Sequence, residues 1–443
     1  MAWMDPLQIF LQQSGIGALF ENPIEGAIRL LFMVWGFVLF VLGLRRVEPL
    51  LLMPLGIAMV LANAPGLHLA SFSCSYVPKK LFESMHVAQG FAGAANIIPI
   101  NATHLAICTP DPHSTPILAW IYQLFVKTEI GPILIFFGIG TLSDFRPMLS
   151  YPVASIIGAA AQLGIIVVSV IAFSTGLFNL EEAMAVGVVG GADGPTTIYT
   201  AINIAPHLVG PLTIAVYSYI ALIPVIQPPI ARVLVPRKYR AIKMPPPREV
   251  KARDIILFWI VTCLAVAFLV PHALPLIIAL ALGNIIKECG ITEVVMRYGK
   301  TVPEALLDIA TILTMLGVGS TLSYDFLSQF VVSKSAEAYL AFLCKAFLAL
   351  GLGLVAFVIS TIGGIGFAWI LYLATKGKIN PLIGCAGVSA VPISARVAQR
   401  EAARVDPSVY ILYHALGPNV AGVIGTAIVA GTYIGFVKSV LTP

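Results

Sequence analysis

Residues 190–197 read GGADGPTT inside an apolar run that extends from about 183 to 204. The run has the composition of a membrane span, yet this stretch places an acid, helix-breaking glycine and proline, and two hydroxyls within it. An ionisable group at mid-bilayer costs about 2.5 to 3.5 kcal/mol on insertion scales, and unsatisfied backbone there adds to the cost. Such a segment survives only where it faces protein or a water-filled cavity. We therefore expect an ion or substrate pathway at Asp193.

The whole chain has the composition of a polytopic membrane protein. Its 443 residues are 58% hydrophobic and only 11% charged, whereas a soluble chain has about 25% charged residues. Apolar runs able to cross about 30 Å of hydrocarbon recur along nearly the whole length, and we predict roughly nine to eleven helical spans, some of them broken. The net charge of +5 reflects Lys and Arg concentrated in short loops, which is a topology signal and does not imply nucleic-acid binding. The sequence therefore predicts an all-α membrane protein without a large soluble domain.

The chain divides into four segments. Residues 1–47 form an N-terminal interfacial segment and a first span, 48–236 a first membrane repeat with a polar excursion at 68–116, 237–253 a basic cytoplasmic linker, and 254–443 a second membrane repeat. The linker is assigned to the cytoplasm because Lys and Arg surround its three consecutive prolines. The six cysteines lack metal-ligand spacing, and Cys74 and Cys108 could pair if the excursion faces the outside.

Internal similarity supports the two halves. GIGTLSDF at 138–145 resembles GVGSTLSYDF at 317–326, and HLVGP at 207–211 resembles HALGP at 414–418. Between these anchors the GGADGPTT stretch falls opposite NPLIGCAGVS at 380–389, another apolar segment interrupted by Gly and Pro. Paired broken segments point to a transporter site. We therefore predict two inverted-topology repeats whose breaks meet near the midplane.

The two breaks offer the chemistry of a small, hard cation. Asp193 supplies a negative charge, and neutral oxygens come from unwound carbonyls and from Thr196, Thr197, Asn380 and Ser389. This combination suits Na⁺ or H⁺. One carboxylate can hold either ion but not both, so competition at Asp193 gives a physical basis for coupling.

Two further side chains have both a functional and a structural interpretation. Tyr219, in the span after the first break, either passes protons or completes an ion shell, or is a packed aromatic. Arg396, after the second break, is suited to hold a carboxylate by two parallel hydrogen bonds, or anchors a helix end at the interface. Arg400 and Arg404 are expected to be interfacial anchors.

Four long motifs occur in order along the chain: 190–197, 217–229 ending IQPP, 380–396, and 417–425 reading GPNVAGVIG. Together they resemble the beta subunit of the sodium-translocating, biotin-dependent decarboxylases, which act on oxaloacetate, methylmalonyl-CoA, glutaconyl-CoA or malonate. The resemblance runs from about Glu48 to the C-terminus.

The resemblance implies a division of labour between subunits. A separate carboxyltransferase and biotin carrier subunit would load CO₂ onto biotin, and this subunit would decarboxylate the carboxybiotin while exporting Na⁺. The architecture implied is a scaffold plus a mobile core, assembled as a homo-trimer with a small membrane subunit in the prokaryotic inner membrane.

Site roles carried over by motif fall on residues of both breaks. Asp193 would alternate between Na⁺ and H⁺. The catalytic group would add Tyr219, Ser389 and Arg396; the Na⁺ ligands would add Thr196, Asn380, Gly384 and Ser389; and carboxybiotin would contact Arg396 and Asn380.

Residue chemistry without the resemblance leaves another class open. A Na⁺- or H⁺-coupled secondary transporter of carboxylates would need the same broken segments. A non-catalytic membrane anchor would have no need for them.

Overall fold

The computed structural model describes residues 22–45, 48–65, 69–70, 72–78, 96–99, 104–110, 116–289, 293, 305–330 and 336–440. The interfacial segment predicted at the N-terminus and most of the polar excursion lie outside these residues. The helices are α3 (Pro23–Leu44), α4 (Pro49–Ala62), α7 (Ile117–Ile121), η1 (Tyr122–Lys127), α8 (Ile130–Leu142), α9 (Arg146–Ser150), α10 (Pro152–Ala161), α11 (Leu163–Ser174), α12 (Leu180–Val188), η2 (Val189–Gly191), α13 (Gly194–Ile204), η3 (Pro206–Leu208), α14 (Val209–Leu234), α15 (Arg237–Arg240), α16 (Ala252–Leu269), η4 (Pro271–Ala273), α17 (Leu274–Glu288), α19 (Leu307–Ser320), α20 (Tyr324–Leu327), α21 (Ala336–Ala374), η6 (Pro381–Gly387), α22 (Ile393–Ala403) and α23 (Leu412–Val440).

Within the described residues, six helical stretches are long and apolar enough to cross a membrane: Pro23–Leu44, Pro152–Ser174, Pro206–Leu234, Ala252–Leu269, Ala336–Ala374 and Leu412–Val440. The pair Ile117–Lys127 and Ile130–Leu142, bent by 55°, would make a seventh span, and α4 and α19 are shorter apolar helices. Large apolar side chains remain exposed along these helices, as they must where the outer solvent is lipid. The predicted all-α polytopic membrane protein is confirmed.

Proline and asparagine set many of the helix starts. Proline stands in the first turn of α3, α4, α10, α13 and α17, where its missing N–H would have no helical partner. Asn22 and Asn179 cap α3 and α12 by accepting from backbone N–H groups three residues later. Proline and asparagine residues, which can be read from the sequence, therefore mark where these helices begin.

The chain forms two compact units that cut across the predicted halves. The first comprises Met1–Pro132 and Asp308–Cys344, and the second comprises Ile133–Leu307 and Lys345–Pro443. Each unit therefore contains chain from both predicted repeats, and α8 and α21 contribute residues to both units. The division of the sequence into four consecutive segments, with a membrane repeat on each side of the linker, stays a prediction.

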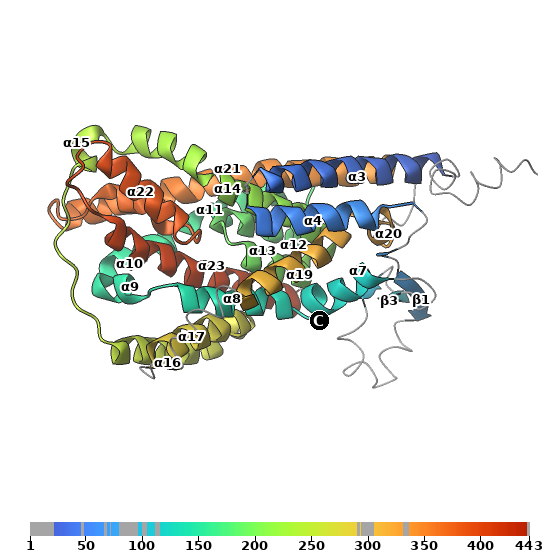
Figure 1. Ribbon diagram of the computed structural model, residues 1–443, viewed down its shortest axis with the longest axis horizontal. Coiled ribbons are helices and arrows are strands. Elements are labelled where there is room, and N and C mark those ends of the chain that lie inside the picture. Colours follow the sequence, from blue (N-terminus) through green and yellow to red (C-terminus); the bar gives the residue numbers. More distant parts are fainter. Residues whose placement is uncertain are drawn as a thin grey trace, which may run out of the picture. The chain divides into compact units, whose positions relative to one another are not determined.

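In the first unit, α3 packs closely on α4 through glycine. A Cβ built on Gly36 would lie 2.8 Å from the carbonyl oxygen of Gly56, so the two backbones touch where only glycine fits. Figure 1 shows the two helices side by side. The end of α4 is tied to the start of α20 by Asn63, whose Nδ2 donates to the Leu322 carbonyl at 2.7 Å.

The excursion contains a small sheet that the sequence analysis did not specify. Strands β1 (Phe72–Pro78), β3 (His104–Pro110) and β2 (Asn96–Pro99) pair antiparallel in the order β1-β3-β2. The register places the Cα atom of Cys74 opposite that of Cys108. Their disulfide pairing stays a prediction.

The second unit contains both broken segments. Here too small residues allow close helix packing: a Cβ on Gly158 of α10 would lie 2.7 Å from the Pro418 carbonyl oxygen of α23. Antiparallel α16 and α17 lie side by side in the same unit (Figure 1). The functional interest lies in how α12, α13, η6 and α22 are arranged within this unit.

Candidate functional site

The first broken segment is a helical hairpin. Its two arms are α12 and α13, and their outer ends lie together because Glu182 in the first turn of α12 bonds His207, just after α13, at 2.8 Å. A span that continued through the membrane would carry these two residues to opposite sides. The GGADGPTT stretch therefore forms a tip between two short arms.

Asp193 is held at this tip as the N-cap of α13. Ala192 before it has a left-handed φ of 55°, which turns the chain sharply between the two arms. The Oδ1 atom of Asp193 accepts from the Thr196 N–H at 3.2 Å. Its Oδ2 atom and the Thr196 hydroxyl are both buried and have no hydrogen-bond partner. The Asp193 Oδ2 and Thr196 Oγ1 atoms, three residues apart in the chain, are therefore available to bind a cation.

The second broken segment is also a hairpin, formed by η6 and α22. Asn380, before η6, donates from Nδ2 to the Arg240 carbonyl at 3.0 Å. Glu401, near the end of α22, lies 3.9 Å from the guanidinium of the same Arg240. Both ends of this hairpin therefore meet the segment that follows α14.

The two tips meet. The Ser389 N–H donates to the Gly191 carbonyl at 2.9 Å, although 198 residues separate them in the chain. Ala192 packs in one apolar cluster with Val388 and Ala390. The convergence of the two breaks, which the sequence analysis inferred from weak internal similarity, is present in the structure.

Helix α23 supports the second tip through polar side chains. The Ser389 hydroxyl bonds the Thr426 hydroxyl at 2.5 Å, and Asn419 donates from Nδ2 to the Val388 carbonyl at 2.6 Å. Thr426 also donates to Gln162 of α10–α11 at 3.0 Å. The tip is thus fixed by a hydrogen-bonded network and not by apolar packing alone.

Among the predicted site residues, Asp193, Thr196 and Ser389 belong to the two tips. Thr197 lies there too, since its hydroxyl donates to the Asp193 carbonyl at 2.8 Å. Arg396 lies on α22 beyond the second tip, and its side chain is exposed.

Asn380 and Gly384 are not placed at the tips. The Asn380 amide donates to the Arg240 and Ile242 carbonyls, and its Oδ1 accepts from the Leu382 N–H. Gly384 is needed for packing, because a Cβ there would lie 2.5 Å from the Gly364 carbonyl of α21.

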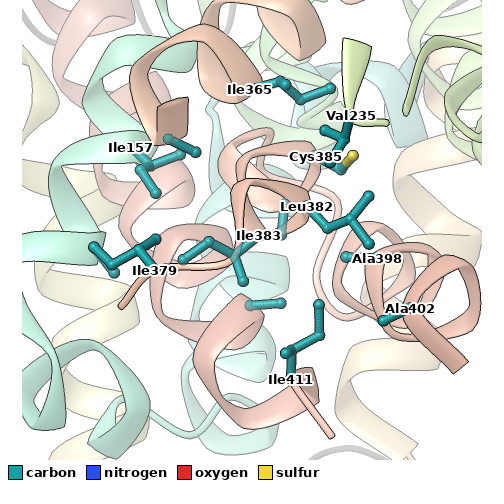
Figure 2. Packing of buried hydrophobic residues seen from close by; sticks show 14 of the residues in the cluster. Ile157, Val235, Ile365, Ile379, Leu382, Ile383, Cys385, Ala398, Ala402 and Ile411 are labelled. Carbon is teal, nitrogen blue, oxygen red and sulfur yellow. The ribbon is translucent and has the colours of Figure 1, made fainter. Parts of the chain in front are cut away.

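Figure 2 shows how η6 is buried. Leu382, Ile383 and Cys385 lie among apolar side chains from α10, α21 and α22. Gln227 of α14 donates to the Cys385 carbonyl at 2.9 Å and so provides a partner for one carbonyl of this irregular segment.

Tyr217, which the sequence analysis did not single out, touches the first tip. A Cβ on Gly194 would lie only 2.3 Å from the Tyr217 hydroxyl oxygen. The Tyr219 hydroxyl instead donates to the Leu350 carbonyl of α21. Both tyrosines belong to the triplet at 217–219, but the helical step between them turns them to different faces of α14. The position of Gly194 shows that the Tyr217 ring lies against the start of α13.

The basic linker is a strap bound to the second unit. Besides the two bonds from Asn380, the Ser150 hydroxyl donates to the Arg248 carbonyl at 2.7 Å, and His414 Nε2 bonds the Pro245 carbonyl at 2.8 Å. Tyr239 packs edge-on against Trp369 of α21, with ring centroids 4.7 Å apart. The strap at 237–253 therefore runs across the base of the second hairpin along a fixed course.

An ion-paired latch closes the base of the first hairpin. Lys345 of α21 donates to both carboxylate oxygens of Glu182 at 2.8 Å. Glu182 also completes a capping box with Asn179 and bonds His207. One buried carboxylate thus joins α12, the end of α13 and α21.

Comparison with known proteins places the chain among the beta subunits of decarboxylases. A family model described as Na⁺-transporting oxaloacetate decarboxylase beta subunit matches residues 28–437. The chain is 40% identical over 393 residues to methylmalonyl-CoA decarboxylase subunit beta of Propionigenium modestum, covering 88% of this chain and 90% of that one. It is 39% identical over 412 residues to oxaloacetate decarboxylase beta chain 2 of Salmonella typhi, with 89% and 91% covered. It is 43% identical over 312 residues to glutaconyl-CoA decarboxylase subunit beta of Acidaminococcus fermentans, with 70% and 78% covered.

Proposed function

The chain belongs to the beta-subunit family of the Na⁺-transporting decarboxylases, and from this premise we propose that it decarboxylates carboxybiotin and uses the reaction to export Na⁺. It is a multi-pass membrane subunit of a decarboxylase. Coupling, ion and substrate contacts, and partners are the parts that we propose.

The observation that carries the proposal is the buried Asp193 carboxylate at the meeting point of the two tips. Its Oδ2 has no hydrogen-bond partner, while the tips join through the Gly191 carbonyl and the Ser389 N–H. A buried carboxylate oxygen without a partner is costly unless a cation or a proton occupies it. The site is thus suited to bind Na⁺ and H⁺ in turn.

In this proposal Asp193 and the Thr196 hydroxyl bind the Na⁺, and the tip carbonyls complete its shell. Ser389 positions the second tip, and Tyr217, against Gly194, takes the place in the proton path that the sequence analysis gave to Tyr219. Because Na⁺ and H⁺ compete for one carboxylate, a proton arriving at Asp193 releases the ion.

The two hairpins enter the membrane from opposite faces. The base of the second meets the basic strap, which the positive-inside rule assigns to the cytoplasm. The base of the first lies at His207, at the other end of the membrane-spanning stretch Pro206–Leu234. This arrangement supports inverted repeats, a scaffold with a mobile core, and an ion route between the two faces.

Arg396 would bind the substrate on the cytoplasmic side. Its exposed guanidinium can bind the carboxylate of carboxybiotin by two parallel hydrogen bonds. Decarboxylation breaks the bond between the ureido nitrogen and the carboxyl carbon, CO₂ leaves, and the nitrogen takes up one proton. We propose that this proton comes through Asp193, so that each turnover vacates the carboxylate for another Na⁺.

The partners proposed are a carboxyltransferase with its biotin carrier and a small membrane subunit, within a homo-trimeric complex in the prokaryotic inner membrane. Asn380, whose amide donates to the strap carbonyls of Arg240 and Ile242, is proposed to act by holding the second hairpin in position and not by touching biotin or Na⁺.

Reconstituted protein given free carboxybiotin tests the proposal. We expect CO₂ release that requires Na⁺, together with uptake of labelled Na⁺ into inside-out vesicles. A coupled secondary transporter would instead move a labelled dicarboxylate and leave carboxybiotin intact, and that result would refute the proposal.

A further inference from the structure

Helix α22 and its C-cap residue carry three arginines at four-residue intervals: Arg396 and Arg400 in the helix and Arg404 at the C-cap. Residues four apart lie one above another on a helix, so the three form a single stripe. All three side chains are exposed, while the opposite face of α22 is buried and made mostly of alanine and valine. The stripe runs from just beyond the second tip to the strap.

The outer end of the stripe lies in an excess of positive charge. Glu401 is fully buried and accepts two hydrogen bonds from Arg232, at 2.8 and 3.0 Å, and one from Arg404 at 2.6 Å. Arg240 lies 3.9 Å from the same carboxylate. One carboxylate thus faces three guanidinium groups, and Arg404 is already paired.

Arg400 has no such partner. Among the residues that the structure describes, neither the Arg400 nor the Arg396 side chain makes a hydrogen bond or an ion pair. Asp406, the next acid along the chain, bonds the backbone and hydroxyl of Ser408 instead. Arg400 therefore presents a free guanidinium between the paired outer end of the stripe and Arg396.

An unpaired guanidinium on a membrane-embedded hairpin does not face lipid, where it costs about 2.5 to 3.5 kcal/mol even on insertion scales. The stripe must line a water-filled space, and the position of its outer end beside the strap opens that space to the cytoplasm.

We propose that Arg400 is an anion-binding residue on the entry route, where it holds the carboxylate of carboxybiotin before Arg396 takes it. This inference rests on the proposed function and deepens it. It also changes the expected role of Arg400 from an interfacial anchor to a substrate contact. A carboxylate approaching from the cytoplasm meets Arg400 as the first unpaired guanidinium and then moves one helical turn, about 6 Å, to Arg396.

The test uses the reconstituted complex with free carboxybiotin as substrate. Arg400→Gln keeps a polar side chain of similar helix propensity but removes the charge. One charge about 6 Å from the bound carboxylate changes affinity by roughly three- to tenfold at a dielectric between that of water and half of it. We expect KM to rise by that factor at low salt with kcat unchanged, and the difference to shrink when choline chloride is added at constant Na⁺.

Arg237→Gln is the matched control. Arg237 is exposed on α15, in the strap. Its replacement by glutamine removes the same charge at a position away from the stripe. Unchanged KM in Arg400→Gln, or an equal rise in Arg237→Gln, would overturn the inference. A loss in Arg400→Gln that follows the anionic-lipid content of the vesicles and not substrate concentration would return Arg400 to the role of an anchor. Failure of the wild-type complex to release CO₂ from carboxybiotin would overturn the proposed function itself, so the two failures are distinguishable.

Discussion

Replacing Asn380 with alanine tests whether this side chain is a ligand of Na⁺ or a structural link between η6 and the strap. The Asn380 side chain is fully buried and makes three hydrogen bonds, two to carbonyls of the strap and one from the Leu382 N–H. Seven residues of 3₁₀ helix follow it, and at about 2.0 Å per residue they place Asn380 roughly 14 Å from the tip. We therefore expect the Asn380 amide not to coordinate an ion held by Asp193.

The expected magnitude follows from these bonds. The Leu382 N–H is buried and would lose its cap, which costs about 1 to 3 kcal/mol. Arg240 and Ile242 are half-buried, so water can replace part of the two lost bonds to their carbonyls, at about 0.5 kcal/mol each. We therefore expect Asn380→Ala to destabilise the strap and η6 locally by about 2 to 4 kcal/mol.

Limited trypsin digestion measures the strap, because its arginines and lysines are cleavage sites once it detaches. We expect cleavage within 237–253 at least tenfold faster than in the wild type, with the Na⁺ concentration for half-maximal activity changed by less than twofold. Asn203→Ala, which loses amide bonds at the base of the first hairpin, is the control and should leave this cleavage rate unchanged.

A tenfold or larger rise in the Na⁺ requirement of Asn380→Ala, with normal resistance to trypsin, would refute this reasoning. Asn380→Asp sharpens the distinction. A carboxylate would keep or strengthen a Na⁺ ligand, but it cannot donate to the strap carbonyls.

Three further predictions concern the first hairpin. Asp193→Asn should abolish Na⁺-dependent CO₂ release while the complex still assembles. In the wild type, the Na⁺ concentration needed for half-maximal activity should rise as pH falls, because protons compete for the same carboxylate. Near-normal turnover of the variant, or a Na⁺ requirement that does not depend on pH, would exclude Asp193 from coupling. Gly194→Ala should lower turnover at least tenfold, because the new methyl group overlaps the Tyr217 ring. Gly366→Ala is the control, since a Cβ there meets no atom within 4 Å, and it should leave turnover unchanged. Equal turnover in both variants would contradict the close contact at the tip. Lys345→Met removes two of the hydrogen bonds to the buried Glu182 carboxylate, which keeps, within the described part of the chain, only its bonds to His207 and Asn179. It should lower the unfolding temperature of the purified complex, by a loss of about 1 to 3 kcal/mol, and an unchanged melting curve would mean that the latch adds no stability.

The sequence by itself determined the class of the protein and the positions of both breaks. Hydropathy is a sum over neighbouring residues, so the membrane spans can be recognised before the fold is known. The same local logic singled out Asp193, because an acid among helix breakers in an apolar run has few roles other than ion binding.

Only the tertiary structure decided what the breaks do. The bond between Ser389 and Gly191 joins residues 198 positions apart, and no local pattern encodes that register. Tyr217 and Tyr219 are two positions apart in one helix, yet they make different contacts. The helical rotation between them turns Tyr217 toward Gly194 and the Tyr219 hydroxyl toward α21. Asn380 stands in a motif beside the tip residues but is bound to the strap. Sequence spacing reports proximity along the chain, whereas ligand geometry depends on how far the backbone travels between residues and on which face each side chain then lies.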